Sequence, residues 1–492
     1  MRDALLIFRK DVRHLWPRIL IVLAIAALEG LLNAAAPAGN PLQLSVVWLW
    51  GFSCVYLTAS AIQEESLPGD NQYWLTRPFS RRGLLMAKVL LLAVFASAPR
   101  MVVQAVALRL NGVSPLRYAS VLFATGVFSL AIGLAAAALA AVTENLMQFL
   151  WVLLPIAAVE ILSLMYGGRE IGQNNVAWIR SSALGALIVA ASIAILIVQY
   201  SRRKTFVSAG ILAGTLAMAA MVPLLVTWHA AFALQSKLGR AIGPASMRIS
   251  FEPSGPAGNY TAEYGKALEG IDLPIRITGI PAGTRAVSER VATTIEAPGG
   301  KTWSSGWTST GAIANPNPLE DSHAIRADGA YRQHLYVDAE FYRAVKDAPV
   351  HLHASVAVTL LGERQSAPIS ARGRTGHLPG DGICGAGPGP FPSNVVVFCD
   401  WPGQAPARVY VQARSLKNGQ TLESLLLPAG PYAPYPTDGS MWSGAETMFT
   451  APPEPVEMKL ETWRAIGHFE RELDIPQIRL SDYAVRRITD PN

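Results

Sequence analysis

Charged side chains are scarce in this sequence. Asp, Glu, Lys and Arg make up 15% of its 492 residues, whereas a typical soluble domain carries about 25%. The scarcity is confined to the first half. Up to about residue 228 Leu, Ala, Val and Ile dominate, and beyond it Gly, Pro, Ser, Thr and charged residues return in ordinary proportions. This division excludes a chain that is soluble throughout, and it predicts a helical membrane bundle followed by a soluble region.

Recognisable catalytic motifs are also missing. Residues 298–302 (PGGKT) resemble the end of a phosphate-binding loop, but Ile295 occupies the position of its first glycine, so we interpret the stretch as a turn. His351 and His353 share one face of a predicted strand without a third metal ligand, and no His-Glu-x-x-His pattern occurs. The sequence therefore predicts no enzyme activity, no bound metal and no cofactor on this chain.

The basic residues do not form the pattern of a nucleic-acid-binding protein. The net charge is +6, but no basic stripe interleaved with aromatic residues is present. The basic residues instead flank the apolar runs. We expect the lipid bilayer as a partner, and no nucleic acid.

Cysteine is rare, with three residues in the chain. Cys54 lies in an apolar run, whereas Cys384 and Cys399 bracket a Gly- and Pro-rich stretch in the second half. Two cysteines around a turn-rich loop favour a disulfide, which persists in oxidising compartments. The alternative is a pair of free thiols.

The first apolar run lacks a convincing signal-peptide cleavage site, so we expect it to be retained as a membrane anchor. Residues 1–18 precede this run. Leu5, Phe8 and Val12 recur at helical spacing, and the basic residues lie mostly away from them. This pattern predicts a basic amphipathic helix at an anionic membrane surface.

Seven apolar runs are long enough to span a bilayer and form the predicted bundle at 19–228. They cover residues 19–36, 44–63, 84–107, 118–141, 147–166, 182–200 and 206–228. Lys and Arg near the ends of these runs number twelve on one side and four on the other. The richer side is cytoplasmic by the positive-inside rule. We therefore expect the N-terminus inside a cell (inner) membrane and, after an odd number of spans, an extracytoplasmic (periplasmic) second half.

Three ionisable residues fall inside predicted spans. Glu29, Arg100 and Glu160 lie at similar depths toward the outer side of the first, third and fifth runs. Charges in lipid are costly and usually face a bundle interior, where they pair. We expect an ion-paired intramembrane cluster; the alternative is that the run boundaries are wrong by one turn and these groups reach interfacial water.

The sequence of the second half predicts β-structure. After a linker at 229–245, hydrophobic residues alternate with polar ones over 350–360 and 456–460. Further predicted strands cover residues 273–278, 394–398 and 407–413. Short strands between Gly- and Pro-rich turns predict an all-β, sandwich-like domain over 246–492, built as one sandwich or two.

The most specific stretch is the polar segment between the second and third runs. It begins at Glu64-Glu65, continues through residues 76–81 (TRPFSR), and leads into the third run at residues 84–88 (LLMAK). Together with the basic N-terminal helix and residues 199–203 (QYSRR), it resembles the permease subunits of type-2 ATP-binding-cassette exporters. The resemblance covers about residues 1–205. The seventh run and the large outer domain depart from that family.

The resemblance implies that the loop at 63–82 contains a coupling helix, which sits in a groove of a separate ATP-binding-cassette ATPase subunit. It also implies a second permease copy or a paralogue. The matching aromatic anchors and polar contacts are Tyr73, Trp74, Arg77, Phe79, Arg81 and Arg82. Such residues also favour lipid headgroups, so anchoring at the membrane surface is the alternative role for this loop.

These observations predict the permease subunit of an ATP-driven exporter, which couples ATP hydrolysis on another chain to export of a substrate. The alternative function is that of a membrane-anchored sensor or binding protein with an extracytoplasmic β-domain and no transport.

Overall fold

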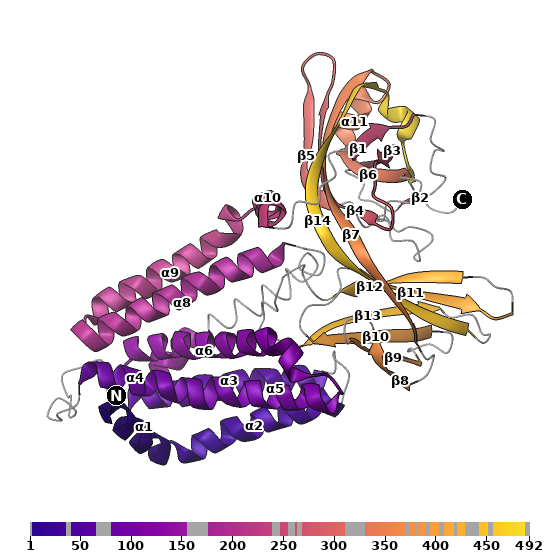
Figure 1. The fold of residues 1–492 in the computed structure, drawn as a ribbon. Helices are drawn as coiled ribbons and strands as arrows, with labels where there is room; N and C mark the ends of the chain where they lie inside the picture. The colour runs from indigo at the N-terminus through magenta and orange to yellow at the C-terminus, as the bar shows by residue number, and fades with distance from the viewer. Residues whose placement is uncertain are drawn as a thin grey trace.

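The computed structural model describes residues 2–35, 41–64, 80–154, 176–238, 247–253, 261–262, 268–309, 330–369, 373–378, 382–388, 394–402, 408–417, 421–428, 442–450 and 456–487. These residues form a bundle of helices and a separate β-rich region (Figure 1).

The first half of the chain forms the helices of the bundle, most of them at the apolar runs of the sequence. They are α1 (Arg2–His14), α2 (Trp16–Ala35), α3 (Pro41–Gln63), α4 (Arg81–Leu92), α5 (Ala98–Leu110), α6 (Ala119–Val142), α8 (Ala177–Arg202), α9 (Thr205–Leu225) and the shorter α10 (Trp228–Leu238). A π-helical turn, Ala93–Ser97, joins α4 to α5, and a 3₁₀ turn, Pro115–Tyr118, leads into α6.

Five segments of the described chain are long and apolar enough to cross a membrane. They are Ser45–Gln63, Arg81–Leu110, Pro115–Val142, Trp178–Arg202 and Thr205–Val222. Helices α1 and α2 meet at 79° and together make a sixth candidate. The chain is therefore a membrane protein. From residue 155 onward, the predicted run at 147–166 lies outside the described residues.

The bend between α1 and α2 has a local cause. Pro17 lacks the amide hydrogen that a continuous helix would require, and its fixed φ angle suits the first turn of a new helix. The amphipathic segment predicted at 1–18 therefore ends at His14, and the first apolar helix begins at Trp16.

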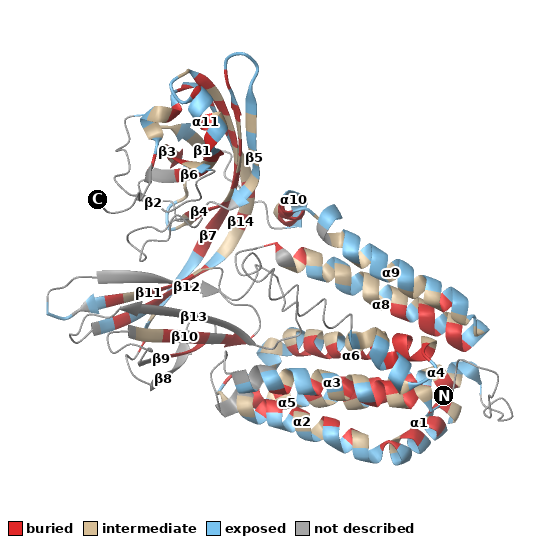
Figure 2. Ribbon diagram, turned by 180° about the vertical axis from the view of Figure 1, so that it is seen from behind, coloured by how far each residue is buried: buried red, intermediate tan, exposed pale blue. Residues whose placement is uncertain are grey.

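The β-rich region lies at the end of the bundle opposite the N-terminus. The start of α1, the end of α3 and the start of α4 lie together at one end, and α10 leads into the strands at the other (Figure 1). Helices α8 and α9 present mostly exposed or half-buried side chains along their lengths (Figure 2), as helices do whose apolar faces contact lipid.

Fifteen strands and one helix are described in the second half. They are β1 (Arg248–Phe251), β2 (Thr261–Ala262), β3 (Leu268–Thr278), β4 (Arg285–Glu296), β5 (Thr302–Ser309), β6 (Ala330–Asp338), α11 (Ala339–Val345), β7 (Val350–Ile369), β8 (Gly373–Leu378), β9 (Gly382–Pro388), β10 (Asn394–Pro402), β11 (Arg408–Ser415), β12 (Thr421–Pro428), β13 (Trp442–Thr450), β14 (Val456–Ile478) and β15 (Arg486–Arg487). The predicted strands are confirmed: each lies inside a longer observed strand, except that β11 begins one residue after its predicted start. The predictions at 273–278, 350–360, 394–398, 407–413 and 456–460 fall in β3, β7, β10, β11 and β14.

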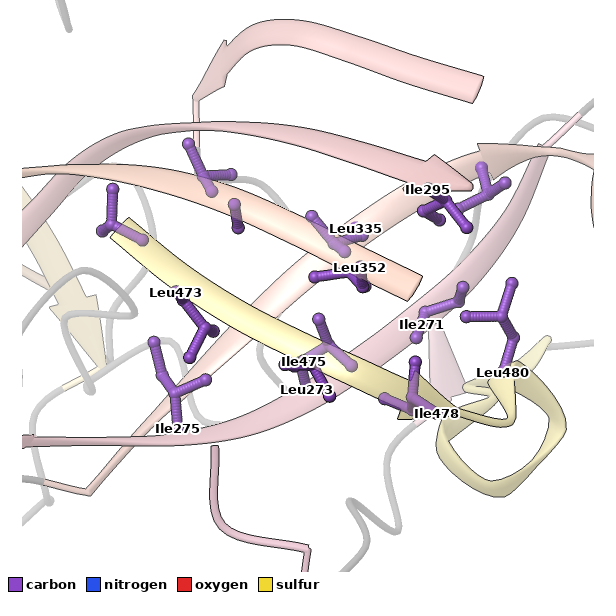
Figure 3. Close-up of a cluster of buried hydrophobic side chains, with 14 of the residues drawn as sticks. Ile271, Leu273, Ile275, Ile295, Leu335, Leu352, Leu473, Ile475, Ile478 and Leu480 are labelled. Atoms are coloured by element: carbon purple, nitrogen blue, oxygen red, sulfur yellow. The ribbon is translucent and has the colours of Figure 1, made fainter. Parts of the chain in front are cut away.

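Ten of these strands make one long sheet in the order β5-β4-β7-β14-β11-β12-β13-β10-β9-β8. Strands β7 and β14 are 20 and 23 residues long and pair antiparallel along most of their lengths. A second sheet, β1-β3-β6, packs against the outer parts of β4, β7 and β14. Ile271, Leu335, Leu352 and Ile475 fill the core between these two layers (Figure 3).

A second core lies nearer the other end of the ten-stranded sheet. Strands β9, β10, β11 and β14 contribute Cys384, Val397, Trp401, Val411 and Leu460 to it. The β-rich region therefore has two lobes, which share the long strands β7 and β14.

The predicted linker at 229–245 begins with a docked helix. On α10, Trp228 and Phe232 stack with ring centroids 4.9 Å apart, and Trp228 lies 5.3 Å from Trp307 of β5. Two aromatic residues four positions apart share one helix face, and this face covers the sheet.

Candidate functional site

Arg100 lies in the first turn of α5. It follows Pro99, which cannot donate a backbone hydrogen bond, and the π turn at Ala93–Ser97 comes just before it. A π turn adds a residue to one turn and rotates everything that follows, and such turns are frequent at functional sites. The Arg100 side chain ends on the buried face of the helix.

The Arg100 guanidinium is paired inside the bundle. Its Nη2 and Nε lie 3.3 and 3.4 Å from Oε1 of Glu29 on α2, and Gln104 Nε2 donates to the same oxygen at 3.1 Å. The guanidinium carbon also lies 4.3 Å from the ring centroid of Trp50 on α3. Three helices thus converge on one charged group, which is how a low-dielectric interior tolerates an ion.

Two of the three predicted members of the intramembrane cluster are therefore brought together. Glu29 and Arg100 are 2% and 4% exposed, which disagrees with the alternative that they reach interfacial water. Glu160 lies outside the described residues. Sequence reasoning missed Gln104 and Trp50, although Gln104 stands one helical turn after Arg100 and so shares its face.

A second buried ion pair lies at the N-terminal end of the bundle. Lys88 Nζ on α4 is 2.8 Å from Asp11 Oδ2 on α1, and it also donates to the carbonyl oxygen of Ala61 on α3 at 2.8 Å. The two side chains are 3% and 2% exposed. The sequence held a signal for this pair, because Lys88 falls inside the predicted third run and needs a partner there.

One face of α1 packs on the bundle. The face that carries Ala4, Ile7 and Asp11 is buried there. Leu5 and Leu6 remain more than half exposed, so the opposite face is the one available to lipid.

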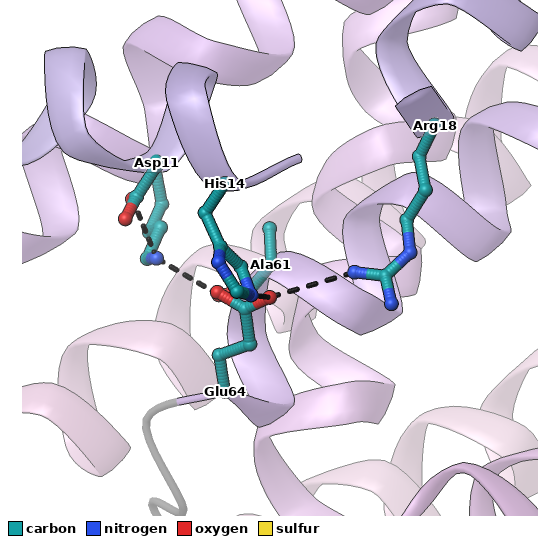
Figure 4. A network of polar contacts seen from close by, with 6 residues as sticks. Asp11, His14, Arg18, Ala61 and Glu64 are labelled. Carbon is teal, nitrogen blue, oxygen red and sulfur yellow. Dashed lines mark hydrogen bonds and ion pairs between the residues drawn. The ribbon is translucent and has the colours of Figure 1, made fainter. Parts of the chain in front are cut away.

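Beside this pair, polar contacts fix the junction of α1 and α2 to the end of α3. Glu64 Oε1 lies 3.0 Å from His14 Nε2 and 3.4 Å from Arg18 Nη1 (Figure 4). On the other flank, Arg81 Nη1 donates to the Ser201 carbonyl oxygen at the end of α8, at 2.6 Å. We call these five residues (His14, Arg18, Glu64, Arg81 and Ser201) the polar frame.

In the sequence, Glu64 and Arg81 of the polar frame flank the predicted ATPase-coupling loop. Tyr73, Trp74, Arg77 and Phe79 lie outside the described residues. At the boundary, Ser80 caps α4 by accepting a hydrogen bond from the Gly83 amide at 3.1 Å. Of the three arginines predicted as contacts, the structure describes two: Arg81 contacts α8, and Arg82 is exposed.

The two cysteines of the second half form a disulfide in the structure. Cys384 of β9 and Cys399 of β10 are directly opposite each other in the antiparallel ladder, and both are buried in the second core. Cys54 is a buried free thiol in α3.

The remaining sequence candidates are structural. Residues 298–302 form the turn between β4 and β5, with Gly299 and Gly300 at φ +87° and +78°, so the turn interpretation is confirmed. His351 Nε2 lies 2.6 Å from Asp474 Oδ1, and this hydrogen bond raises the pKa of His351. Within the described ranges, no group of three or more His, Cys, Asp or Glu side chains is arranged to hold a metal ion.

No family model and no curated protein matches the sequence. The features of the described residues that bear on function are the two buried ion pairs and the polar frame.

Proposed function

We propose that this chain is the membrane permease subunit of an ATP-driven exporter, with ATP hydrolysed by a separate ATP-binding-cassette subunit. The observation that carries the proposal is the polar frame. It holds both flanks of the segment 65–79, Glu64 through His14 and Arg18, and Arg81 through Ser201. In this proposal, a partner that binds this segment acts on the end of α3 and the start of α4, to which the segment is joined.

A continuous path leads from this loop into the bundle. Helix α4 starts at Arg81 and continues through the π turn into α5, where Arg100 pairs with Glu29. Nineteen residues at 1.5 Å each span roughly 30 Å. Displacement of the loop would therefore reach the buried ion pair along one stiff element. In this proposal the pair lies beside the substrate path.

The proposal includes the topology. Seven spans, with the N-terminus in the cytoplasm of a cell (inner) membrane, would leave the β-rich region in the periplasm as a sandwich-like outer domain. The Lys and Arg asymmetry supports this orientation, and so does the position of the β-rich region opposite the N-terminal end (Figure 1). The core between the ten-stranded sheet and the sheet β1-β3-β6 supports the sandwich-like architecture.

One observation favours the alternative, a membrane-anchored sensor. Helix α10 docks on the sheet through Trp228 and Phe232, and α9 is tied to α8 by a 2.7 Å hydrogen bond from Arg180 Nε to the Val226 carbonyl oxygen. A ligand on the β-rich region would thus act directly on two membrane helices. This function requires no ATPase.

Co-purification distinguishes the two functions. The wild-type chain, extracted from its native membrane in mild detergent, should carry an ATP-hydrolysing subunit. Replacement of Trp74 and Phe79 by Ala should release that subunit while the bundle still inserts and folds, because aromatic residues dominate many protein interfaces. Phe123→Ala with Trp151→Ala, at exposed positions away from the loop, is the matched control and should retain it. If the wild-type protein carries no ATPase under any nucleotide condition, the exporter proposal fails and the sensor proposal replaces it.

A further inference from the structure

A hollow of about 390 Å³ opens where the two lobes of the β-rich region meet. Its walls are the turn before β4 and side chains from β4, β7, β11 and β14: residues 280–286, Arg364, Gln412, Glu461 and Trp463. The volume is within the range of small-molecule sites, about 300–1,000 Å³.

Trp463 is one of the residues that line the hollow, and it is mostly buried, at 7% exposed. The guanidinium carbons of Arg285 and Arg364 each lie 5.8 Å from its ring centroid, and Arg285 is also 4.7 Å from the ring of Tyr410. Two guanidinium groups therefore pack against the indole and bring positive charge to this part of the hollow.

The one carboxylate in the lining is already neutralised. Glu461 accepts hydrogen bonds from Arg364 Nη2 and from Trp463 Nε1, each at 2.6 Å, and its side chain is 4% exposed. Arg285 and Arg364 together outweigh this single negative charge. The hollow thus has a net positive character, which attracts an anion.

The backbone around the hollow is irregular. The β7–β14 ladder shifts register between Thr462 and Arg464 and again between Ala465 and Gly467. On β7, Glu363 adopts φ +50°, an unusual conformation for a residue other than glycine. Bulges re-aim side chains and are frequent beside binding sites. Here they lie next to Trp463 and Arg364 in the β7–β14 ladder.

We propose that this hollow binds a small organic anion. A carboxylate or phosphate of the ligand is bound by Arg364, whose side chain is 52% exposed and whose planar donors match either group. The apolar part of the ligand lies against the turn before β4, where Ile280 and Pro281 line the hollow, and Gln412 supplies a neutral hydrogen-bonding group. The site goes beyond the proposed function, because an exporter and a sensor could each use it.

Calorimetric titration of the purified full-length protein in detergent tests the site with three probes: benzoate, phenyl phosphate and the neutral benzamide. We expect saturable binding of one molecule of benzoate or phenyl phosphate per chain. Benzamide should bind at least about tenfold more weakly, the loss expected for one charge-assisted hydrogen bond. The stronger of the two anions identifies the natural ligand as a carboxylate or a phosphate.

Variants locate the binding. Arg364→Gln should weaken anion binding about tenfold or more. Because that change also disturbs Glu461, Ala282→Phe provides a second test: it fills the hollow from the exposed turn and should abolish binding while the thermal unfolding temperature stays close to that of the wild type. Arg464→Gln is the control. It removes a positive charge next to Trp463 in the sequence, from an exposed ion pair with Glu363, and it should leave anion binding unchanged.

Three results would overturn the site: no saturable binding of either anion in the millimolar range, equal binding of benzamide, or unchanged anion binding in both Arg364→Gln and Ala282→Phe.

Discussion

Arg100 Nη2 lies 3.3 Å from Glu29 Oε1, and the two side chains are 5% and 2% exposed. The pair joins α5 to α2 inside the bundle. Within the part of the chain that the structure describes, neither residue has a second charged partner. Each charge therefore compensates the other in a region of low dielectric constant.

Loss of Arg100 should be costly. Arg100→Met leaves Glu29 buried without its counter-ion, and removal of one partner of a buried pair costs about 3–5 kcal/mol. We expect a lower unfolding temperature in detergent and a reduced yield of inserted protein. Arg109→Met, at an exposed position on the same helix, is the control and should behave like the wild type. Adding Glu29→Gln to Arg100→Met should restore part of the stability; equal tolerance of all these changes would show that the pair contributes little.

Lys88→Met should release α1 from the bundle. The change leaves Asp11 buried without its cation. Undocking of α1, which exposes Asp11 to water, then costs less free energy than keeping the unpaired carboxylate buried. Amide hydrogen exchange should be faster in residues 2–14 of the variant, and Asp11→Asn in the same chain should restore part of the protection. Lys204→Met, an exposed position near the same end, is the control. Unchanged exchange in the Lys88 variant would mean that apolar contacts alone hold α1.

The disulfide predicts a specific labelling pattern. When the protein is denatured without reductant, a thiol reagent should modify Cys54 alone, because Cys384 and Cys399 are bonded. Closing a loop of this length should contribute about 3 kcal/mol in the chain-entropy model, so Cys384→Ser with Cys399→Ser should lower the unfolding temperature of the β-rich region. Modification of all three cysteines in the wild type would show that the bond does not form in the cell.

The contact between α10 and the ten-stranded sheet should become less stable at acidic pH. His468 Nδ1 is 3.0 Å from Thr359 Oγ1, its Nε2 is 2.9 Å from Gln235 Nε2, and burial lowers the pKa of His468 from 6.5 to about 4. The folded protein therefore holds a neutral imidazole that the unfolded chain would protonate below about pH 6.5. This contribution to stability is complete above that pH and is lost as the pH falls toward about 4, by roughly 3 kcal/mol at most.

Thermal unfolding at about pH 7.5 and about pH 5 measures this loss. A His468→Gln variant cannot titrate at this position, so the difference between its two unfolding temperatures should be smaller than in the wild type. An equal difference in both proteins would assign the acid sensitivity to other groups.

Local sequence patterns predicted much of the fold. The apolar runs located the described membrane helices, because a bilayer core demands about 20 apolar residues in succession. Alternation located β7 and β14, since one face of each strand is buried. The extra length of these strands was not predictable, because the bulges between Thr462 and Gly467 interrupt the alternation.

Long-range contacts were harder to predict. Asp11 reads as one polar position on an amphipathic helix, and only the packing of α1 on α4 shows that it meets Lys88, 77 residues away. The docking of Trp228 on Trp307 depends likewise on where α10 leaves the bundle. By contrast, the Glu29–Arg100 pair followed from the sequence, because isolated charges in apolar runs require partners.

Site-directed photo-crosslinking tests the proposed coupling most directly. A photoreactive amino acid in place of Trp74 should, in intact native cells, attach this chain to a subunit that binds and hydrolyses ATP. The same amino acid in place of Leu116, which is 87% exposed and lies on the turn between α5 and α6 at the other end of the bundle, should not capture that subunit. Adduct formation at position 74 with lipid alone, or capture of the ATPase equally from both positions, would contradict the account.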